Sequence, residues 1–228
     1  MGIKIAFFDM DSTVIAQEGI DELAKLCGKG EEVSAITAGA MHHGWNFEES
    51  LCKRIDILKE AGLTEAQLDE CYANITLTQG AQELLKYLRE NNIRTVLVSG
   101  GFSSFTQRIA DRLGFDENYG NELLFENGTL AGMEGCRKFE NQIIGKEAKA
   151  AVIEKECTKH CIPLGKALFV GDGGNDVEAA KKAGFSIAYH TKNAALREVT
   201  TYQIDTGGLE VAIPLLTLHI CGKKAIIC

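Results

Sequence analysis

The chain has 228 residues, of which 45% are hydrophobic and 25% charged, and its formal net charge is −8. A chain of this length can bury one full hydrophobic core beside a small second module, and it needs no disulfide bonds for stability. The acidic excess disfavours nucleic acid or an anionic membrane as the main partner. An anionic substrate must therefore find positive charge locally, from a metal ion or from a few Lys and Arg side chains.

The eight cysteines are scattered without a single Cys-x-x-Cys pair, which favours reduced thiols. Cys157 and Cys161 lie one helical turn apart with His160 between them, which leaves a soft-metal site as an alternative. No apolar run reaches the roughly 18 residues of a transmembrane helix. The first apolar stretch is interrupted by Asp9 and Asp11 and does not read as a secretory signal. We therefore expect a cytoplasmic protein.

The first predicted strand is the apolar run Ile3–Phe8, which ends at two carboxylates, Asp9 and Asp11. Its β-branched and aromatic residues favour a buried strand, and the ligands of open parallel sheets bind at such strand ends. If the chain stays extended, the side chains of both carboxylates project to the same side of the strand. Two anions this close need a shared proton or a cation between them.

A long helical region follows instead of a single crossover helix. Helices are predicted over residues 18–26, 31–41, 47–61 and 65–74, separated by glycines. We therefore predict a helical cap over residues 15–75, inserted into a core formed by residues 1–14 and 76–228. A cap that hangs over the paired aspartates could exclude water and select the substrate.

The alternation of helices and strands resumes with a helix over residues 81–91, whose apolar face is formed by Ala81, Leu84, Leu85 and Leu88. A strand over residues 94–98 ends at Ser99-Gly100-Gly101, ahead of a helix over 102–113. A hydroxyl and glycine amides in this place suit a phosphate oxygen. Asn127-Gly128 predicts a β-hairpin turn.

A helix over residues 145–161 then precedes a strand over 167–170, a helix over 177–183 and a last strand over 185–189. The resulting fold class is α/β: a Rossmann-like parallel sheet carrying an inserted α-helical cap.

A second acidic cluster, Asp172 and Asp176, follows the strand that ends at Val170. The intervening glycines permit a tight turn in which backbone amides approach a ligand. Oxygen ligands from Asp side chains suit Mg²⁺, which also keeps water and substrate phosphate in its coordination shell. Two such clusters after two strands favour a metal over a shared proton.

These segments resemble the motifs of haloacid-dehalogenase-type phosphatases: Asp9–Thr13, Ser99–Gly101, a lysine before the last cluster, and Gly171–Asp176. Within that family, residues 17–22, 36–41, 46–51, 53–54, 77–81 and 187–190 resemble the phosphoserine phosphatase branch. The resemblance runs to about residue 190, and the tail after Leu209 lies outside it. It implies the family fold and hydrolysis of O-phospho-L-serine to L-serine and phosphate, the last step of serine biosynthesis.

The resemblance also implies a role for each matching residue. Asp9 would be the nucleophile that forms an aspartyl-phosphate, and Asp11 the general acid and base. Mg²⁺ would be held by Asp9, by the Asp11 backbone carbonyl, by Asp172 and, through water, by Asp176. The phosphate would be bound by Ser99, Gly100 and a lysine, with Asn175 ordering the loop.

The choice of lysine lies between Lys146 and Lys149, three residues apart on one predicted helix. The spacing of the family favours Lys149. Substrate choice would rest on the cap, where the planar fork of Arg54 suits a carboxylate and Glu18 suits an ammonium group.

Met41 and Phe47 would form the walls of this pocket. Two departures from the family pattern are the segment His42–Trp45, where Trp45 could reshape the pocket, and Gln79.

Two other functions are considered beside phosphoserine hydrolysis. The same chemistry could act on phosphothreonine, phosphohomoserine or another small phosphomonoester. A phospho-accepting regulatory domain would need adjacent acids after the first strand and a shorter chain without a cap. The Asp-x-Asp spacing and the inserted helices disfavour this second possibility. The sequence leaves open whether the protein is a monomer or a homodimer.

Overall fold

The computed structural model describes residues 2–43 and 46–220, with side chains for residues 2–37 and 46–219. In this part of the chain seven strands form one sheet in the order β4-β3-β2-β1-β5-β6-β7. Only the β3–β4 pair is antiparallel among them. The strands are β1 (Ile5–Phe8), β2 (Arg94–Phe102), β3 (Glu117–Glu126), β4 (Thr129–Glu134), β5 (Ala167–Gly171), β6 (Phe185–Tyr189) and β7 (Tyr202–Ile204).

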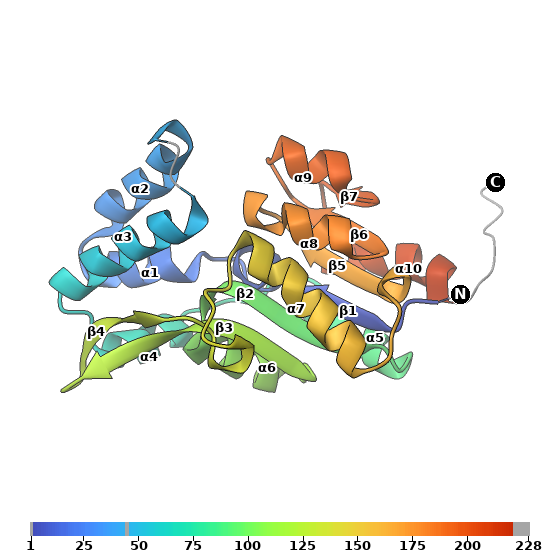
Figure 1. Ribbon diagram of the computed structural model, residues 1–228, viewed down its shortest axis with the longest axis horizontal. Coiled ribbons are helices and arrows are strands. Elements are labelled where there is room, and N and C mark those ends of the chain that lie inside the picture. The colour runs from blue at the N-terminus through green and yellow to red at the C-terminus, as the bar shows by residue number, and fades with distance from the viewer. Residues whose placement is uncertain (1, 44–45, 221–228) are drawn as a thin grey trace.

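Helices cover both faces of this sheet (Figure 1). One face packs against α5 (Ala81–Glu90), α6 (Ser103–Leu113) and α10 (Ala212–Ile220). The other packs against α7 (Lys146–Lys159), α8 (Val177–Lys182) and α9 (Ala194–Val199). None of the described helices combines the length and the apolar character needed to cross a lipid bilayer. The predicted α/β class with a largely parallel sheet is confirmed.

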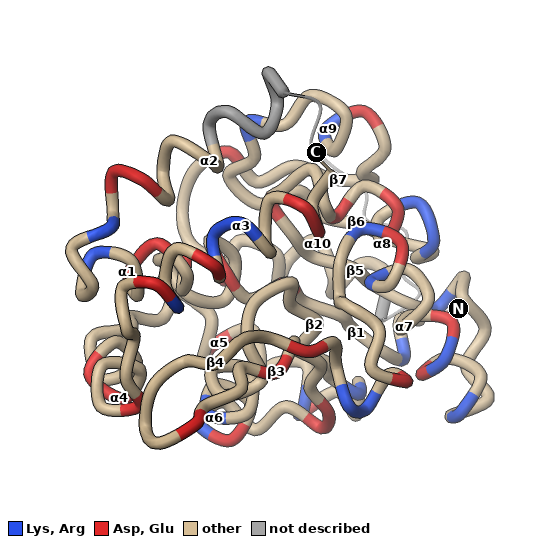
Figure 2. The backbone as a smooth tube through the Cα atoms, turned by 60° about the vertical axis from the view of Figure 1, so that its left-hand side comes forward, with Lys and Arg blue, Asp and Glu red and all other residues tan. Residues whose placement is uncertain are grey.

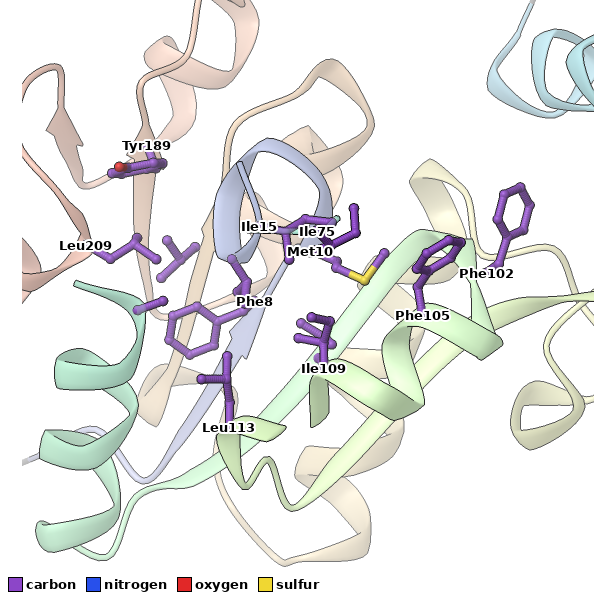
Figure 3. Close-up of a cluster of buried hydrophobic side chains, with 14 of the residues drawn as sticks. Phe8, Met10, Ile15, Ile75, Phe102, Phe105, Ile109, Leu113, Tyr189 and Leu209 are labelled. Atoms are coloured by element: carbon purple, nitrogen blue, oxygen red, sulfur yellow. The ribbon is translucent and has the colours of Figure 1, made fainter. Parts of the chain in front are cut away.

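The alternation of side chains along β1 explains these two layers. Ile5 and Phe7 join the core under α7 to α9, whereas Ala6 and Phe8 join the core under α5, α6 and α10. In Figure 3, Phe8 lies beside the apolar side chains of α6, among them Ile109 and Leu113. β1 and β5 contain no charged residue, and Figure 2 shows them free of red and blue. The strands that carry the two acidic clusters are thus anchored in apolar surroundings.

The inserted helices are α1 (Gly19–Leu26), α2 (Gly30–His43), α3 (Phe47–Glu60) and α4 (Glu65–Ala73). Two of them begin with a reciprocal capping box, Asn46 with Glu49 in α3 and Thr64 with Gln67 in α4. Figure 1 shows α1, α2 and α3 standing together at one end of the molecule. The expectation of an inserted helical cap is confirmed.

The two chain segments that connect the cap to the sheet run side by side. The amide of Ala16 donates to the carbonyl of Thr76 at 3.0 Å, and that of Thr78 donates to Val14 at 2.9 Å. A second attachment joins the loop between α3 and α4 to the tip of the β3–β4 hairpin, where Leu130 N–H donates to the Leu63 carbonyl at 2.7 Å. The cap boundaries at residues 15 and 75 stay a prediction, and these contacts lie next to them.

The structure departs from the sequence-based elements at several places, among them the short helix α9, for which no prediction was made. β2 continues through Ser99-Gly100-Gly101 to Phe102 instead of ending at Val98, because this segment stays extended. The strand over residues 185–189 is not the last, since the three-residue β7 follows it. The tail contains a helix, α10, for which no prediction was made. The hairpin turn is confirmed, with positive φ at Asn127 and Gly128.

The packing of α5 on the sheet gives a test of the core. Leu84 is fully buried, and we expect Leu84→Ala to lower the free energy of unfolding by about 2–5 kcal/mol because it leaves a cavity. Gln82→Ala, on the exposed side of the same helix, should change it by less than about 0.5 kcal/mol. Urea denaturation of the two variants measures the difference. Equal effects would contradict the assigned face of α5.

Candidate active site

A tight turn after β1 delivers the first two carboxylates. The Asp9 side chain accepts a hydrogen bond from the amide of Met10 at 2.8 Å. Ser12 has a φ of 53° and reverses the chain. The chain therefore does not stay extended beyond Asp11, yet Asp9 and Asp11 still line the same cavity.

Three carboxylates from β1 and from the loop after β5 meet beside this turn. Asp9, Asp172 and Asp176 each offer an oxygen, and these oxygens lie within 4.8 Å of one another. Burial and the charge of Asp176 raise the pKa of Asp9 well above its usual range. The same two causes raise the pKa of Asp172 to about 7. A cation at this point would relieve the repulsion.

Lys149 of α7 is the positive charge within the cluster. Its Nζ lies 2.8 Å from Asp9 Oδ1 and 2.6 Å from Asp176 Oδ1, and the side chain is fully buried. Burial alone would lower the pKa of Lys149, but the two carboxylates raise it above its ordinary value. Lys146 instead points to Glu178, at 3.9 Å. Of the two lysines weighed from the sequence, Lys149 is the one at the cluster.

The distribution of hydrogen bonds shows where a metal ion fits. Asp176 uses both oxygens, one with Lys149 and the other with the amides of Asp172 and Gly173, each at 3.0 Å. In the described part of the chain, Oδ2 of Asp9 and Oδ2 of Asp172 accept no hydrogen bond. These two oxygens are therefore available for direct ligation, and Asp176 is better placed to act through water. An all-oxygen set of this kind fits a hard divalent cation.

Asp11 turns away from the three-acid cluster toward the cap. Its Oδ1 accepts the amide of Gly19 at 2.7 Å, and its Oδ2 accepts the Ser99 hydroxyl at 3.1 Å. Burial raises the pKa of Asp11, and these two hydrogen bonds act in the opposite direction. The Asp11 carboxylate thus connects β2 to the start of α1 through these two hydrogen bonds.

The end of β2 forms the floor of the cavity through Gly100 and Gly101. Ser99 is buried, and its hydroxyl also accepts the Gly101 amide at 2.8 Å. The carbonyl of Gly100 is held by the side-chain amide of Asn121 at 2.9 Å. Ser99 therefore lies below the cavity surface, and the glycine backbone is what a ligand would meet.

The opposite end of the cavity is formed by the cap. Arg54 is 9% exposed and uses Nε to donate to the Ser50 carbonyl at 3.2 Å. Its terminal nitrogens have no hydrogen-bond partner among the described residues. Burial lowers the pKa of Arg54. A buried guanidinium with free donors is a strong site for a planar anion such as a carboxylate.

Glu18 lies at the edge of the same cavity and accepts the Ser12 hydroxyl at 2.6 Å. Removal of water by the surrounding protein and the charge of Asp11 raise its pKa to about 8. Phe47 stands over the glycine floor, close to Gly100 and Gly145. The side chains of Met41 and Trp45, both singled out from the sequence, lie outside the described residues.

The resulting cavity measures about 110 Å³ and has polar walls at both ends. Ile20, Leu51 and Phe102 contribute apolar surface to its lining. A wider opening of about 710 Å³ shares Glu18, Phe47, Arg54 and Asn175 with it and leads outward between cap and sheet. The inner volume suits a small molecule.

Two residues that support the site were not found from the sequence. The hydroxyl of Thr13 donates to Asp172 Oδ1 at 3.2 Å. Asn121 joins the floor to the start of α7, because its Oδ1 accepts the amide of Ile144 at 2.8 Å. Both are buried polar residues. Thr13 lies in the Asp9–Thr13 motif, but neither its contact nor those of Asn121 were predicted, because the partners lie far away in sequence.

Comparisons with known proteins identify relatives of this chain. A phosphoserine phosphatase of Archaeoglobus fulgidus is 40% identical over 98% of the chain, which spans 62% of that protein's length. One of Albidiferax ferrireducens is 38% identical over 93% of the chain and 89% of its own length. A solved structure described as a phospho-aspartyl intermediate analogue of phosphoserine phosphatase superposes with a TM-score of 0.86. It is 35% identical, and the match covers 95% of this chain and 100% of that one.

The family model that matches the chain covers residues 6–181, from β1 through most of α8. That range contains the acidic cluster, Lys149 and the glycine floor, together with the inserted helices that carry Arg54. The chain belongs to the haloacid dehalogenase-like hydrolases.

Proposed function

We propose that this hydrolase is a Mg²⁺-dependent phosphatase that converts O-phospho-L-serine to L-serine and phosphate. The observation that carries the proposal is a single small cavity with a metal-suited acidic cluster at one end and the buried Arg54 at the other. Phosphoserine has a phosphate at one end and a carboxylate and an ammonium at the other. The names of the related proteins support the same substrate.

The proposed Mg²⁺ would be held by the carboxylates of Asp9 and Asp172 and by the Asp11 backbone carbonyl, with Asp176 acting through water. When bound, it would neutralise the charge on the phosphoryl group and hold that group in place. Lys149 holds Asp9 in a fixed orientation at 2.8 Å and adds positive charge beneath the phosphate. The amide of Gly100 contributes a hydrogen bond to a phosphate oxygen, whereas the Gly101 amide is used by the Ser99 hydroxyl.

In the first step, Asp9 attacks phosphorus and the bond from phosphorus to the serine oxygen breaks. Asp11 gives its proton to that departing oxygen. The raised pKa of Asp11 supports this role because it favours the protonated form. Asp11 then takes a proton from water, the water oxygen attacks phosphorus, and the bond between phosphorus and Asp9 breaks. Phosphate leaves and both carboxyl groups return to their starting states.

Arg54 binds the substrate carboxylate through its free terminal nitrogens, and Glu18 binds the ammonium. Phe47 closes the cavity over the glycine floor. These cap residues are separate from the reacting groups, so the proposal assigns substrate choice and chemistry to different segments.

We also propose that the protein acts in the cytoplasm. The cysteines in the described part of the chain form no disulfide, which suits a reducing compartment.

Asp9→Asn tests the nucleophile. The amide cannot attack phosphorus, so phosphate release should fall by a factor of roughly 10⁴ or more. A malachite-green assay measures release, and circular dichroism checks that the fold is retained. Asp111→Asn, an exposed position on α6, should keep wild-type activity. Activity retained by Asp9→Asn would exclude the covalent route.

Arg54→Gln tests the substrate. Loss of charge-assisted hydrogen bonds worth about 3 kcal/mol should raise KM for phosphoserine on the order of a hundredfold. Turnover of p-nitrophenyl phosphate should change little because that substrate has no carboxylate. Lys59→Ala, an exposed position on the same helix, should alter neither. Equal losses on both substrates would contradict the carboxylate role and favour another phosphomonoester.

The raised pKa values predict how pH and metal affect stability. The pKa of Asp172 lies at about 7 in the folded chain and at its usual 3.8 when unfolded. Between these values the folded state holds a proton that the unfolded state has lost, so the metal-free protein loses stability as pH rises. Mg²⁺ requires the ionised carboxylate. The rise in Tm on adding Mg²⁺ should therefore be larger near pH 8 than near pH 5.5.

Differential scanning fluorimetry in EDTA and in Mg²⁺ measures this difference. Asp172→Asn should remove most of the pH dependence of the Mg²⁺ effect on Tm. The asparagine amide does not titrate in this range and does not provide the negative charge that binds Mg²⁺. A Mg²⁺ effect that shrinks as pH rises would refute the proposed coupling.

A further inference from the structure

The loop between β6 and α9, residues 190–193, packs against the loop that carries Asp172. The side chain of Thr191 is 6% exposed, and its hydroxyl donates a hydrogen bond to the backbone carbonyl of Asp172. The same hydroxyl accepts the amide of Asn193 at 3.0 Å. The side-chain amide of Asn193 lies beside Gly174. One buried hydroxyl thus joins two loops that lie at the ends of neighbouring strands, β5 and β6.

Four hydrogen bonds hold Asp172 and the peptide that follows it, and Thr191 supplies one of them. The Thr13 hydroxyl donates to the Asp172 carboxylate at 3.2 Å, and the Asp172 amide donates to the Asp176 carboxylate at 3.0 Å. Thr13 and Asp176 both belong to the acidic motifs, but Thr191 comes from outside them. Its contact holds the carbonyl of the peptide between Asp172 and Gly173, whose amide donates to Asp176 at 3.0 Å. Thr191 is thus the partner of this peptide that comes from a neighbouring loop.

The loop that carries Thr191 is itself anchored. The amide of His190 donates to the Ile204 carbonyl of β7 at 2.8 Å. Asn193 caps α9 through the Leu196 amide at 3.0 Å. Arg197 donates to the Thr191 carbonyl at 3.4 Å and forms a two-pronged ion pair with Asp205. Because the loop is tied to β7 and α9, it can act as a rigid support for its neighbour.

We infer that Thr191 is a positioning residue for the metal: it holds the Asp172 loop so that the carboxylate is preset for a divalent cation. The inference rests on the proposed Mg²⁺ site. Removal of the hydroxyl would leave the Asp172 carbonyl and the Asn193 amide without this partner in a buried place. The loop would then relax, and the metal would have to reorder it on binding. Outer contacts of this kind commonly change metal affinity by roughly 10- to 100-fold.

The test compares three substitutions in the full-length protein. Thr191→Val keeps the shape and removes the hydroxyl, whereas Thr191→Ser keeps the hydroxyl. Thr95→Val is the matched control: Thr95 is 3% exposed and donates to the Asp116 carboxylate, at the opposite end of its strand from the cavity. Isothermal titration with Mg²⁺ alone measures Kd without substrate, and thermal unfolding in EDTA measures fold stability.

We expect Thr191→Val to raise the Mg²⁺ Kd by roughly tenfold or more, and Thr191→Ser and Thr95→Val to stay within about twofold of wild type. At saturating Mg²⁺, Thr191→Val should recover most of the wild-type kcat, so that its defect lies in the metal concentration required.

An unchanged Kd in Thr191→Val would overturn the inference and leave the proposed function intact. A Thr95→Val variant weakened as much as Thr191→Val would also overturn it, because the effect would then be general destabilisation. Wild-type protein that binds no Mg²⁺ would overturn the metal site itself, and this inference with it.

Discussion

The repulsion among Asp9, Asp172 and Asp176 is the constraint on which the rest of the site depends. Their oxygens lie within 4.8 Å of one another, and a single buried cation, Lys149, stands among them. Burial raises the pKa values of Asp9 and Asp172, and the charge of Asp176 raises them further because one lysine cannot balance three carboxylates. The same imbalance makes the site receptive to a divalent cation, and through that cation to a phosphate that the net charge of −8 would otherwise repel.

Such a concentration of buried charge destabilises a fold unless other parts of the chain offset it. β1 and β5 are fully buried and uncharged, and apolar side chains cover both of their faces. Parallel pairing of these two strands, with Phe8 opposite Val170, brings both acidic loops to the same edge. The apolar packing of β1 and β5 therefore fixes the positions of the carboxylates. Lys149 and the loop amides determine the orientation of their side chains.

Local sequence patterns predicted much of this arrangement. The strand before Asp9 and the apolar face of α5 follow from the spacing of hydrophobic residues, and the clusters at strand ends follow from topology. The three-residue β7 was too short to produce a periodic signal. The support given by Thr13, Asn121 and Thr191 depends on partners that only the folded chain brings near. The turn at Ser12 could not be foreseen either, because a positive φ in a non-glycine residue is set by its surroundings.

The cap and the glycine floor meet at one contact, where the Phe47 ring lies close to Gly100. A Cβ atom at Gly100 would stand 2.5 Å from the Phe47 ring, and one at Gly145 would stand 3.1 Å from it. The absence of a side chain at Gly100 lets the ring come this close, and a Cβ atom at Gly145 would require the ring to move slightly. Asn121 holds the backbone at Gly100 and next to Gly145, through the Gly100 carbonyl and the Ile144 amide. A shift of the cap that moves Phe47 would therefore change its contact with the Gly100 backbone, which lines the cavity beside the acidic cluster. The position of the cap and the shape of the cavity floor are coupled through this contact.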